Sequence, residues 1–259
     1  MSAAAEASPI DFMGTNRVHL NRRLGAWFRH NARHFPWRDA VSPFHVTVAE
    51  ILLRKTRAED VVPVYWELLS QFPTPAGLAR ARVSTLRRLV SPLGLRSRGD
   101  LLKQLGQELV RRHNGQVPAD GPALSQLPGM GRYAACAVLS FAFGKRKPIV
   151  DSTIGRLLRR LTGVTGEGHA YLDERLWKIA SALLPASGPS VRRHNYALLD
   201  FAALVCTRAT PRCGFCVLSQ VCISHGGGSH GILGSEPFHG RWRAGHRIGG
   251  CRGRHPRVC

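Results

Sequence analysis

The chain has 259 residues, and 37 Lys and Arg against 16 Asp and Glu give it a formal net charge of +21. A chain of this length can bury a large core, and so strong a positive charge favours a polyanionic partner such as nucleic acid. No long apolar span or strongly amphipathic basic helix is evident, and the first residues lack the basic region and apolar core of a secretory signal; both points argue against a membrane or exported protein.

The first half of the sequence predicts amphipathic helices separated by prolines and glycines. We expect residues 1–14 to form a short disordered lead. Leu20, Leu24 and Trp27 then share one helical face, and an aromatic-proline turn over residues 35–38 closes this helix. Further apolar stripes lie within residues 61–72, 86–90 and 101–109. Because no stretch alternates with period two, we predict an all-α fold.

A helix predicted over residues 46–56 carries two polar residues of interest. Glu50 lies among the inward-facing Val48, Ile51 and Leu52. Such a carboxylate is either a solvated edge residue or, if buried, a group whose raised pKa lets it donate a proton. Arg54 follows one turn later and could contact a phosphate or remain in solvent.

The sequence LPGMGRY over residues 127–133 predicts a tight turn that opens a helix. Its two glycines can take positive φ and let the backbone approach a phosphate closely. The N–H groups and the positive dipole end at the helix start then form an anion site. The expected contacts to double-stranded DNA are Leu127, Gly129, Gly131 and Arg132.

Two further helices are predicted directly after this turn. An alanine-rich apolar run over residues 133–143 indicates a buried helix that ends at Gly144. The second helix has apolar residues at i, i+3, i+4 and i+7 from Ile154. Asp151 stands where that helix begins, and from the residues alone Asp151, Ser152 or Thr153 is interpreted as its N-cap.

Together, LPGMGRY, FAFGK and the Val150-Asp151 pair followed by a helix resemble the helix-hairpin-helix DNA glycosylases of the endonuclease III superfamily. The resemblance implies that Asp151 is catalytic, and its MutY-type and thymine-mismatch branches have a glutamate at the place of Glu50. Bifunctional members carry a Schiff-base lysine where this chain has Tyr133, and a phenol cannot form that adduct. MutY-type enzymes have a wedging glutamine where Arg54 stands, and many members have Asn in place of Thr153.

The resemblance also implies a two-lobed helical fold with the active cleft between the lobes. A central helical barrel would cover residues 40–150 with the hairpin at 124–144, and the second lobe would join 15–39 to 151–224. The tail over 225–259 is predicted to be disordered and basic, because it is rich in Gly, His and Arg and carries +5 of the net charge.

Four cysteines near the end of the predicted core follow the pattern C-x6-C-x2-C-x5-C. Such spacing indicates one metal centre, and from the residues alone a zinc site remains the structural alternative. The superfamily's [4Fe-4S] loop has the same spacing, so the resemblance implies an iron-sulfur cluster that positions DNA and takes no part in bond cleavage. The predicted ligands are Cys206, Cys213, Cys216 and Cys222.

These observations predict a base-excision-repair DNA N-glycosylase, a hydrolase of N-glycosyl bonds that takes its target nucleotide out of the base stack. The segments EILLRKT and LLDFAALVC look like the thymine-mismatch type, which favours thymine or uracil opposite guanine. Adenine excision opposite guanine or oxidised guanine is the alternative, and a non-catalytic DNA-binding module is a third. Against adenine, LGLR lacks the tyrosine pair of MutY-type enzymes, and the tail is too short to be their C-terminal recognition domain.

Tyr133 in place of the lysine predicts a monofunctional enzyme that leaves an abasic site. We expect the protein to act as a monomer on double-stranded DNA that contains a mismatch. Its expected location is the cytoplasm of a bacterium, in association with the nucleoid.

Overall fold

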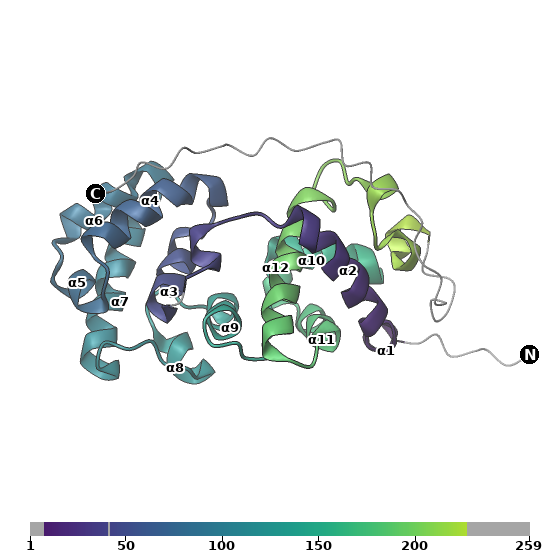
Figure 1. The fold of residues 1–259 in the computed structure, drawn as a ribbon, viewed down its shortest axis with the longest axis horizontal. Coiled ribbons are helices and arrows are strands. Elements are labelled where there is room, and N and C mark those ends of the chain that lie inside the picture. Colours follow the sequence, from purple (N-terminus) through teal and green to yellow (C-terminus); the bar gives the residue numbers. More distant parts are fainter. Residues whose placement is uncertain (1–7, 41, 227–259) are drawn as a thin grey trace, which may run out of the picture.

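The computed structural model describes residues 8–40 and 42–226, and every regular element within them is a helix (Figure 1), which confirms the predicted all-α class. In chain order the α-helices are α1 (Pro9–Thr15), α2 (Arg17–Asn31), α3 (Pro43–Leu52), α4 (Ala58–Gln71), α5 (Pro75–Arg80), α6 (Val83–Val90), α7 (Ser97–His113), α8 (Gly121–Gln126), α9 (Arg132–Phe141), α10 (Ser152–Thr162), α11 (Glu174–Leu183) and α12 (Gly188–Leu204). The 3-10 helices are η1 (Pro36–Arg38), η2 (Ser91–Leu93), η3 (Ala170–Leu172), η4 (Cys213–Phe215), η5 (Ser219–Val221) and η6 (Ile223–His225). Among the described helices, none combines the length and the apolar character that crossing a bilayer requires.

The helices gather in two groups, with α3 and α9 between them (Figure 1). Helices α4 to α7 lie on the left of that view, where α7 packs against both α5 and α6. A Cβ on Gly106 of α7 would lie 2.6 Å from the backbone nitrogen of Ala79, so only glycine lets α7 approach α5 this closely. The right-hand group holds α1, α2, α10, α11 and α12. The lobe boundaries proposed from the sequence, at residues 40 and 150, stay a prediction.

The N-terminal segment differs from the disordered lead expected over residues 1–14. Pro9–Thr15 forms helix α1, which packs against α11 and buries the side chain of Met13 completely. A helix of seven residues has too few turns to show a periodic pattern, and its stability comes from packing on a helix far away in the sequence. Residues 1–7 lie outside the described residues, and so do residues 227–259 of the tail predicted to be disordered over 225–259.

A buried ion-pair network ties the turn after α2 to helix α12. The Asp200 carboxylate is fully buried and accepts bonds from the guanidinium groups of Arg33 (Nε, 2.7 Å) and Arg38 (Nη1, 2.7 Å). Burial alone would raise the pKa of Asp200, but Arg38 and Arg33 hold it below its usual range. Asp200 therefore has a structural role, since it holds the turn after α2 against α12.

Candidate active site

The predicted hairpin joins α8 to α9 and packs on the C-terminal end of α3. Gly129 takes a φ of 80°, and the N–H of Met130 donates to the carbonyl oxygen of Leu127 at 3.0 Å. A Cβ on Gly129 would lie 3.6 Å from Ile51 and from the Arg54 guanidinium. Leu127 is buried, so the structure leaves its backbone, and not its side chain, for the DNA contact expected of it.

Glu50 lies on the inner face of α3, and only 6% of the residue is exposed. Within the described part of the chain, no group forms a hydrogen bond or ion pair with its carboxyl group. Burial, and secondly the charge of Asp151, raise the pKa of Glu50 from 4.5 to about 8. The carboxyl group is therefore protonated at neutral pH, which is the form that can donate a proton.

Asp151 is the N-cap of α10, as its position in the sequence indicated. Its Oδ1 accepts hydrogen bonds from the backbone N–H groups of Thr153 (2.9 Å) and Ile154 (2.6 Å). Among the described residues, no donor reaches Oδ2, which leaves this oxygen for a ligand or a water molecule. Burial raises the pKa of Asp151, while the two N–H donors and the charge of Arg156 oppose that rise. The N-cap hydrogen bonds therefore use only one of the two oxygens of this carboxyl group.

Tyr133, in the first turn of α9, completes the set of three predicted catalytic residues. Burial raises the pKa of its phenol well above the ordinary value, and the charges of Glu50 and Asp151 raise it further. These mutual effects place the three side chains in one electrostatic environment, although they come from α3, α9 and the start of α10. The fold thus brings together residues as far apart in the sequence as Glu50 and Asp151.

Tyr196 on α12 belongs to the same environment, and the sequence analysis did not identify it. Its ring stacks on Phe141 with 4.1 Å between centroids, and the guanidinium of Arg38 lies over the Tyr196 ring, 4.5 Å from its centroid. The hydroxyl group is buried, and burial raises its pKa, which the nearby Arg192 opposes. The only signal in the sequence was a polar hydroxyl within an apolar helical run, which is a weak one.

The two arginines proposed to contact DNA differ in their surroundings. Arg54 is exposed beside the hairpin, and no carboxylate of the described chain pairs with it. Arg132 forms an exposed ion pair with Glu174, and its guanidinium stacks over Trp177 at 4.0 Å. Arg132 therefore already links α9 to α11, and a DNA contact would require it to share or leave that pair.

The four clustered cysteines lie on the loop that follows α12, and all four are free thiols. The Nη1 atom of Arg160, on α10, lies 3.4 Å from Sγ of Cys206, and the Cys222 thiol donates to the Arg160 carbonyl oxygen at 3.3 Å. Burial, and then the charges of Cys222, Cys206 and Cys213, raise the pKa of Cys216 to about 11. The thiols therefore influence one another, but within the described residues no three His, Cys, Asp or Glu side chains converge closely enough to hold a single metal ion.

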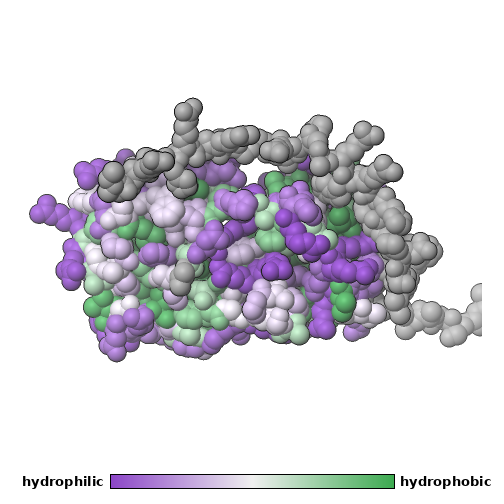
Figure 2. All heavy atoms as spheres, viewed as in Figure 1, coloured by the Kyte–Doolittle hydropathy of each residue, from purple (hydrophilic) through white to green (hydrophobic). Residues whose placement is uncertain are grey.

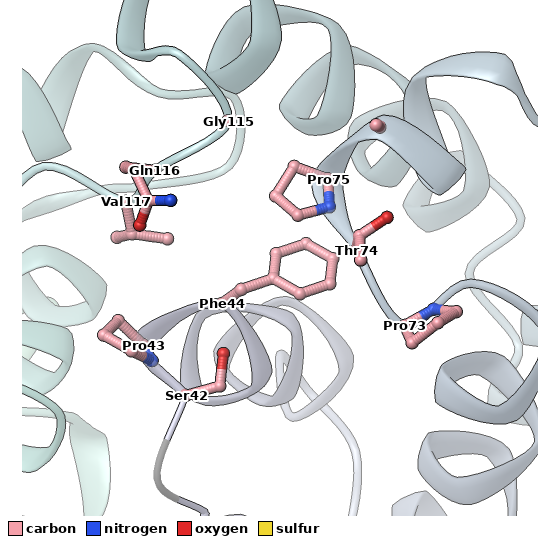
Figure 3. Close-up of a pocket in the computed structure, with 10 residues that line it drawn as sticks. Ser42, Pro43, Phe44, Pro73, Thr74, Pro75, Gly115, Gln116 and Val117 are labelled. Carbon is pink, nitrogen blue, oxygen red and sulfur yellow. The ribbon is translucent and has the colours of Figure 1, made fainter.

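A separate cavity of about 300 Å³ lies at the N-terminal end of α3 (Figure 3). Pro43, Phe44, Pro75 and Val117 line it, with their side chains facing one another across the opening. None of the predicted catalytic or DNA-contacting residues lies there. The face of the molecule shown in Figure 2 is largely hydrophilic across its middle and right, with only small hydrophobic patches between.

Comparison with known proteins agrees with this geometry. The family model described as "HhH-GPD superfamily base excision DNA repair protein" matches residues 48–182, more than half of the chain. A thymine/uracil-DNA glycosylase from Pyrobaculum aerophilum is 42% identical over 81% of this chain and 93% of its own length. An adenine DNA glycosylase from Mycobacterium tuberculosis is 34% identical over 79% of this chain and 67% of its own.

Solved structures give the same result for the fold. The structure of a thermostable thymine-DNA glycosylase superposes with a TM-score of 0.76 at 30% identity, over 82% of this chain and 97% of the other. A trapped endonuclease III–DNA covalent intermediate superposes with a TM-score of 0.71 at 22% identity, over 82% of this chain and 97% of the other, and it supports the likeness of fold alone.

Proposed function

Because the chain belongs to the HhH-GPD superfamily of base excision DNA repair proteins, we propose that it is a monofunctional DNA N-glycosylase that removes thymine or uracil opposite guanine. The observation that carries this proposal is the electrostatic interaction of the buried Glu50 with the half-buried Asp151. Glu50 is neutral and has no protein partner, and Asp151 is held at a helix start with one free oxygen. The identity of 42% to a thymine/uracil-DNA glycosylase supports the choice of substrate.

The two carboxyl groups suit two different tasks in breaking an N-glycosyl bond. Their environments differ, since Glu50 lies in an apolar setting and Asp151 accepts two backbone N–H bonds. Glu50 would donate its proton to the departing base. Asp151 would stabilise the positive charge that develops on the deoxyribose and orient the attacking water through its free oxygen.

The side chain that follows the hairpin decides whether the strand is also cut. Schiff-base formation needs an amine, and Tyr133 offers a phenol whose burial keeps it protonated. We therefore propose that the reaction stops at an abasic site.

Excision on labelled duplexes with G:T, G:U, G:A and oxidised-G:A pairs, followed by alkali, tests the proposal. We expect alkali-dependent cleavage of the first two substrates. Asp151→Asn on the same duplexes is the control for a contaminating glycosylase. Activity confined to the two adenine substrates would refute the proposed specificity, and activity on none would favour a non-catalytic DNA-binding module.

Adenine excision is the second candidate, and one observation favours it. A carboxylic acid with a pKa of about 8, as found for Glu50, can protonate a purine ring nitrogen. An adenine DNA glycosylase at 34% identity is among the relatives. The substrate panel separates this candidate from the first.

We also propose that the four thiols of the cysteine loop hold a [4Fe-4S] cluster. The thiols are free and influence one another's pKa, and the Arg160 guanidinium beside Cys206 suits a negatively charged sulfur. Four thiolates are the usual ligands of such a cluster, and a Cys₄ zinc site is the alternative. The cluster would hold the loop against α10. Stoichiometric zinc without iron in anaerobically purified protein would exclude it.

The remaining features are proposals of the same kind. We propose that the protein binds mismatched duplex DNA as a monomer in the cytoplasm, with its catalytic residues between the lobes 40–150 and 15–39 plus 151–224. Light scattering of the free protein and of its complex with one duplex tests the monomer. A mass of two chains per duplex would contradict it.

A further inference from the structure

A small pocket of about 140 Å³ lies beside the hairpin, since two of its lining residues, Arg54 and Leu101, are neighbours of Gly129. Two turns build it: the one after α3, where Lys55 takes a φ of 54°, and the one before α7, where Gly94 takes a φ of 84°. Its lining residues are Arg54, Lys55, Leu95, Ser97, Arg98 and Leu101. Three of these six side chains are cationic, and none is acidic.

Arg98 is the unusual member of this set, because it is only 1% exposed. Its guanidinium donates to the carbonyl oxygens of Leu93 and Arg54 and to the hydroxyl of Thr56, all of them neutral acceptors. Its Nε is buried without a partner, and no carboxylate of the described chain forms an ion pair with it. Burial and the charge of Arg54 lower the pKa of Arg98, which reports how poorly its positive charge is compensated.

A buried cation without a counter-charge is costly unless an anion binds beside it. The positive end of the dipole of α7, a helix of 17 residues that begins at Ser97, points to the same place. The exposed side chains of Arg54 and Lys55 stand at the mouth of the pocket. The buried charge of Arg98, the dipole of α7 and the side chains of Arg54 and Lys55 all favour one small anion at this position.

We propose that this pocket binds a phosphodiester of the DNA backbone, as a site separate from the glycine hairpin. The proposal rests on the proposed DNA-binding function and adds a contact to it. Gly129 of the hairpin lies against Arg54, so one duplex can reach both sites. The hairpin offers backbone N–H groups, whereas the pocket offers the side chains of Lys55 and Arg54 above the buried charge of Arg98.

The test is the salt dependence of binding to a fully paired, fluorescein-labelled duplex, measured by anisotropy with wild type and Lys55→Gln. Loss of one phosphate contact lowers the slope of log affinity against log salt by about 1 and weakens binding equally for all sequences. The matched control is Arg111→Gln, which removes an arginine from the other end of α7 where it pairs with Glu108. We expect the slope to fall for Lys55→Gln and to stay at the wild-type value for the control.

An unchanged slope for Lys55→Gln, or an equal fall for Arg111→Gln, would overturn the proposal. Arg98→Gln is a second variant. Because Arg98 also holds both turns, the affinity of this variant for DNA is interpreted only together with its melting temperature. The duplex carries no mismatch, and the result therefore does not depend on excision. If the slope falls for Lys55→Gln but the wild-type protein excises no base, the phosphate site stands and the proposed enzyme activity is refuted. If the wild-type protein excises its substrate but the slope is unchanged, the phosphate site alone is refuted.

Discussion

The buried carboxyl group of Glu50 predicts a conflict between stability and activity. Its pKa is about 8 in the folded protein and 4.5 ordinarily, so between these values the folded state binds a proton that the unfolded state has lost. Stability from this group is fully present below pH 4.5 and is lost as the pH rises through 8. At pH 7 the loss amounts to about 3 kcal/mol, from about 1.4 kcal/mol for each pH unit above 4.5.

Glu50→Gln removes the titration while it keeps the shape of the side chain. We expect the variant to be more stable than wild type at neutral pH, with a difference that grows by about 4 kcal/mol between about pH 5 and pH 8. We also expect it to lose excision activity by about 10²-fold, because the amide cannot donate a catalytic proton. Urea unfolding followed by circular dichroism and single-turnover excision measure the two effects.

Two controls make this comparison specific. The pKa of the buried His194 is lowered to about 4 by burial, so wild-type stability also falls as the pH drops through 6.5. That contribution is present in both proteins and cancels in their difference at each pH. Glu67→Gln, on the exposed face of α4, should leave the unfolding curve at its wild-type position at every pH. A Glu50→Gln variant that is no more stable at pH 8 than at pH 5, relative to wild type, would refute the reasoning.

Three further predictions follow from the same geometry. Asp151→Asn should keep DNA binding and lower excision by at least about 10²-fold, as gel shift and single-turnover assays would show, and unchanged turnover would remove Asp151 from the mechanism. Borohydride should trap no covalent enzyme–DNA adduct, because Tyr133 has no amine; efficient trapping would mean that the strand is cut as well. Asp200→Asn should destabilise the protein by about 3 kcal/mol or more in urea unfolding, because it removes the buried negative charge that pairs with the guanidinium groups of Arg33 and Arg38. The exposed pair of Asp100 with Arg87 is the control, and Asp100→Asn should cost under about 1 kcal/mol; equal losses would contradict the role of burial.

Much of the fold could be predicted because its signals are local. The helical stripes, the paired glycines of the hairpin and the left-handed Asn114-Gly115 end of α7 all follow from residues within a few positions of one another. Helix α1 could not be predicted, since the burial of Met13 depends on α11. Its sequence holds no periodicity that separates it from a loop.

The candidate site, like the fold, could be predicted from the sequence only in part. The position of Asp151 at a helix start was visible in the sequence, but its free Oδ2 was not. Whether Glu50 was a solvated edge residue or a buried acid remained open until α9 and α10 were placed around it. Tyr196 and the buried charge of Arg98 could not be found, because each depends on contacts with segments more than forty residues away.

The packing of the last α-helices on the first ones has a consequence for synthesis on the ribosome. Helix α2 packs on α12, Asn21 donates to the carbonyl oxygen of Leu183, and Arg33 pairs with Asp200 across 167 residues. At translation rates of about 5–20 residues per second, the first helices therefore wait on the order of ten seconds for their partners. Throughout that interval Leu20, Leu24 and Trp27 lack the surface that buries them in the finished protein. The segment made first is the last to reach its native packing, and it is where a nascent chain of this protein is most exposed to aggregation and to chaperones.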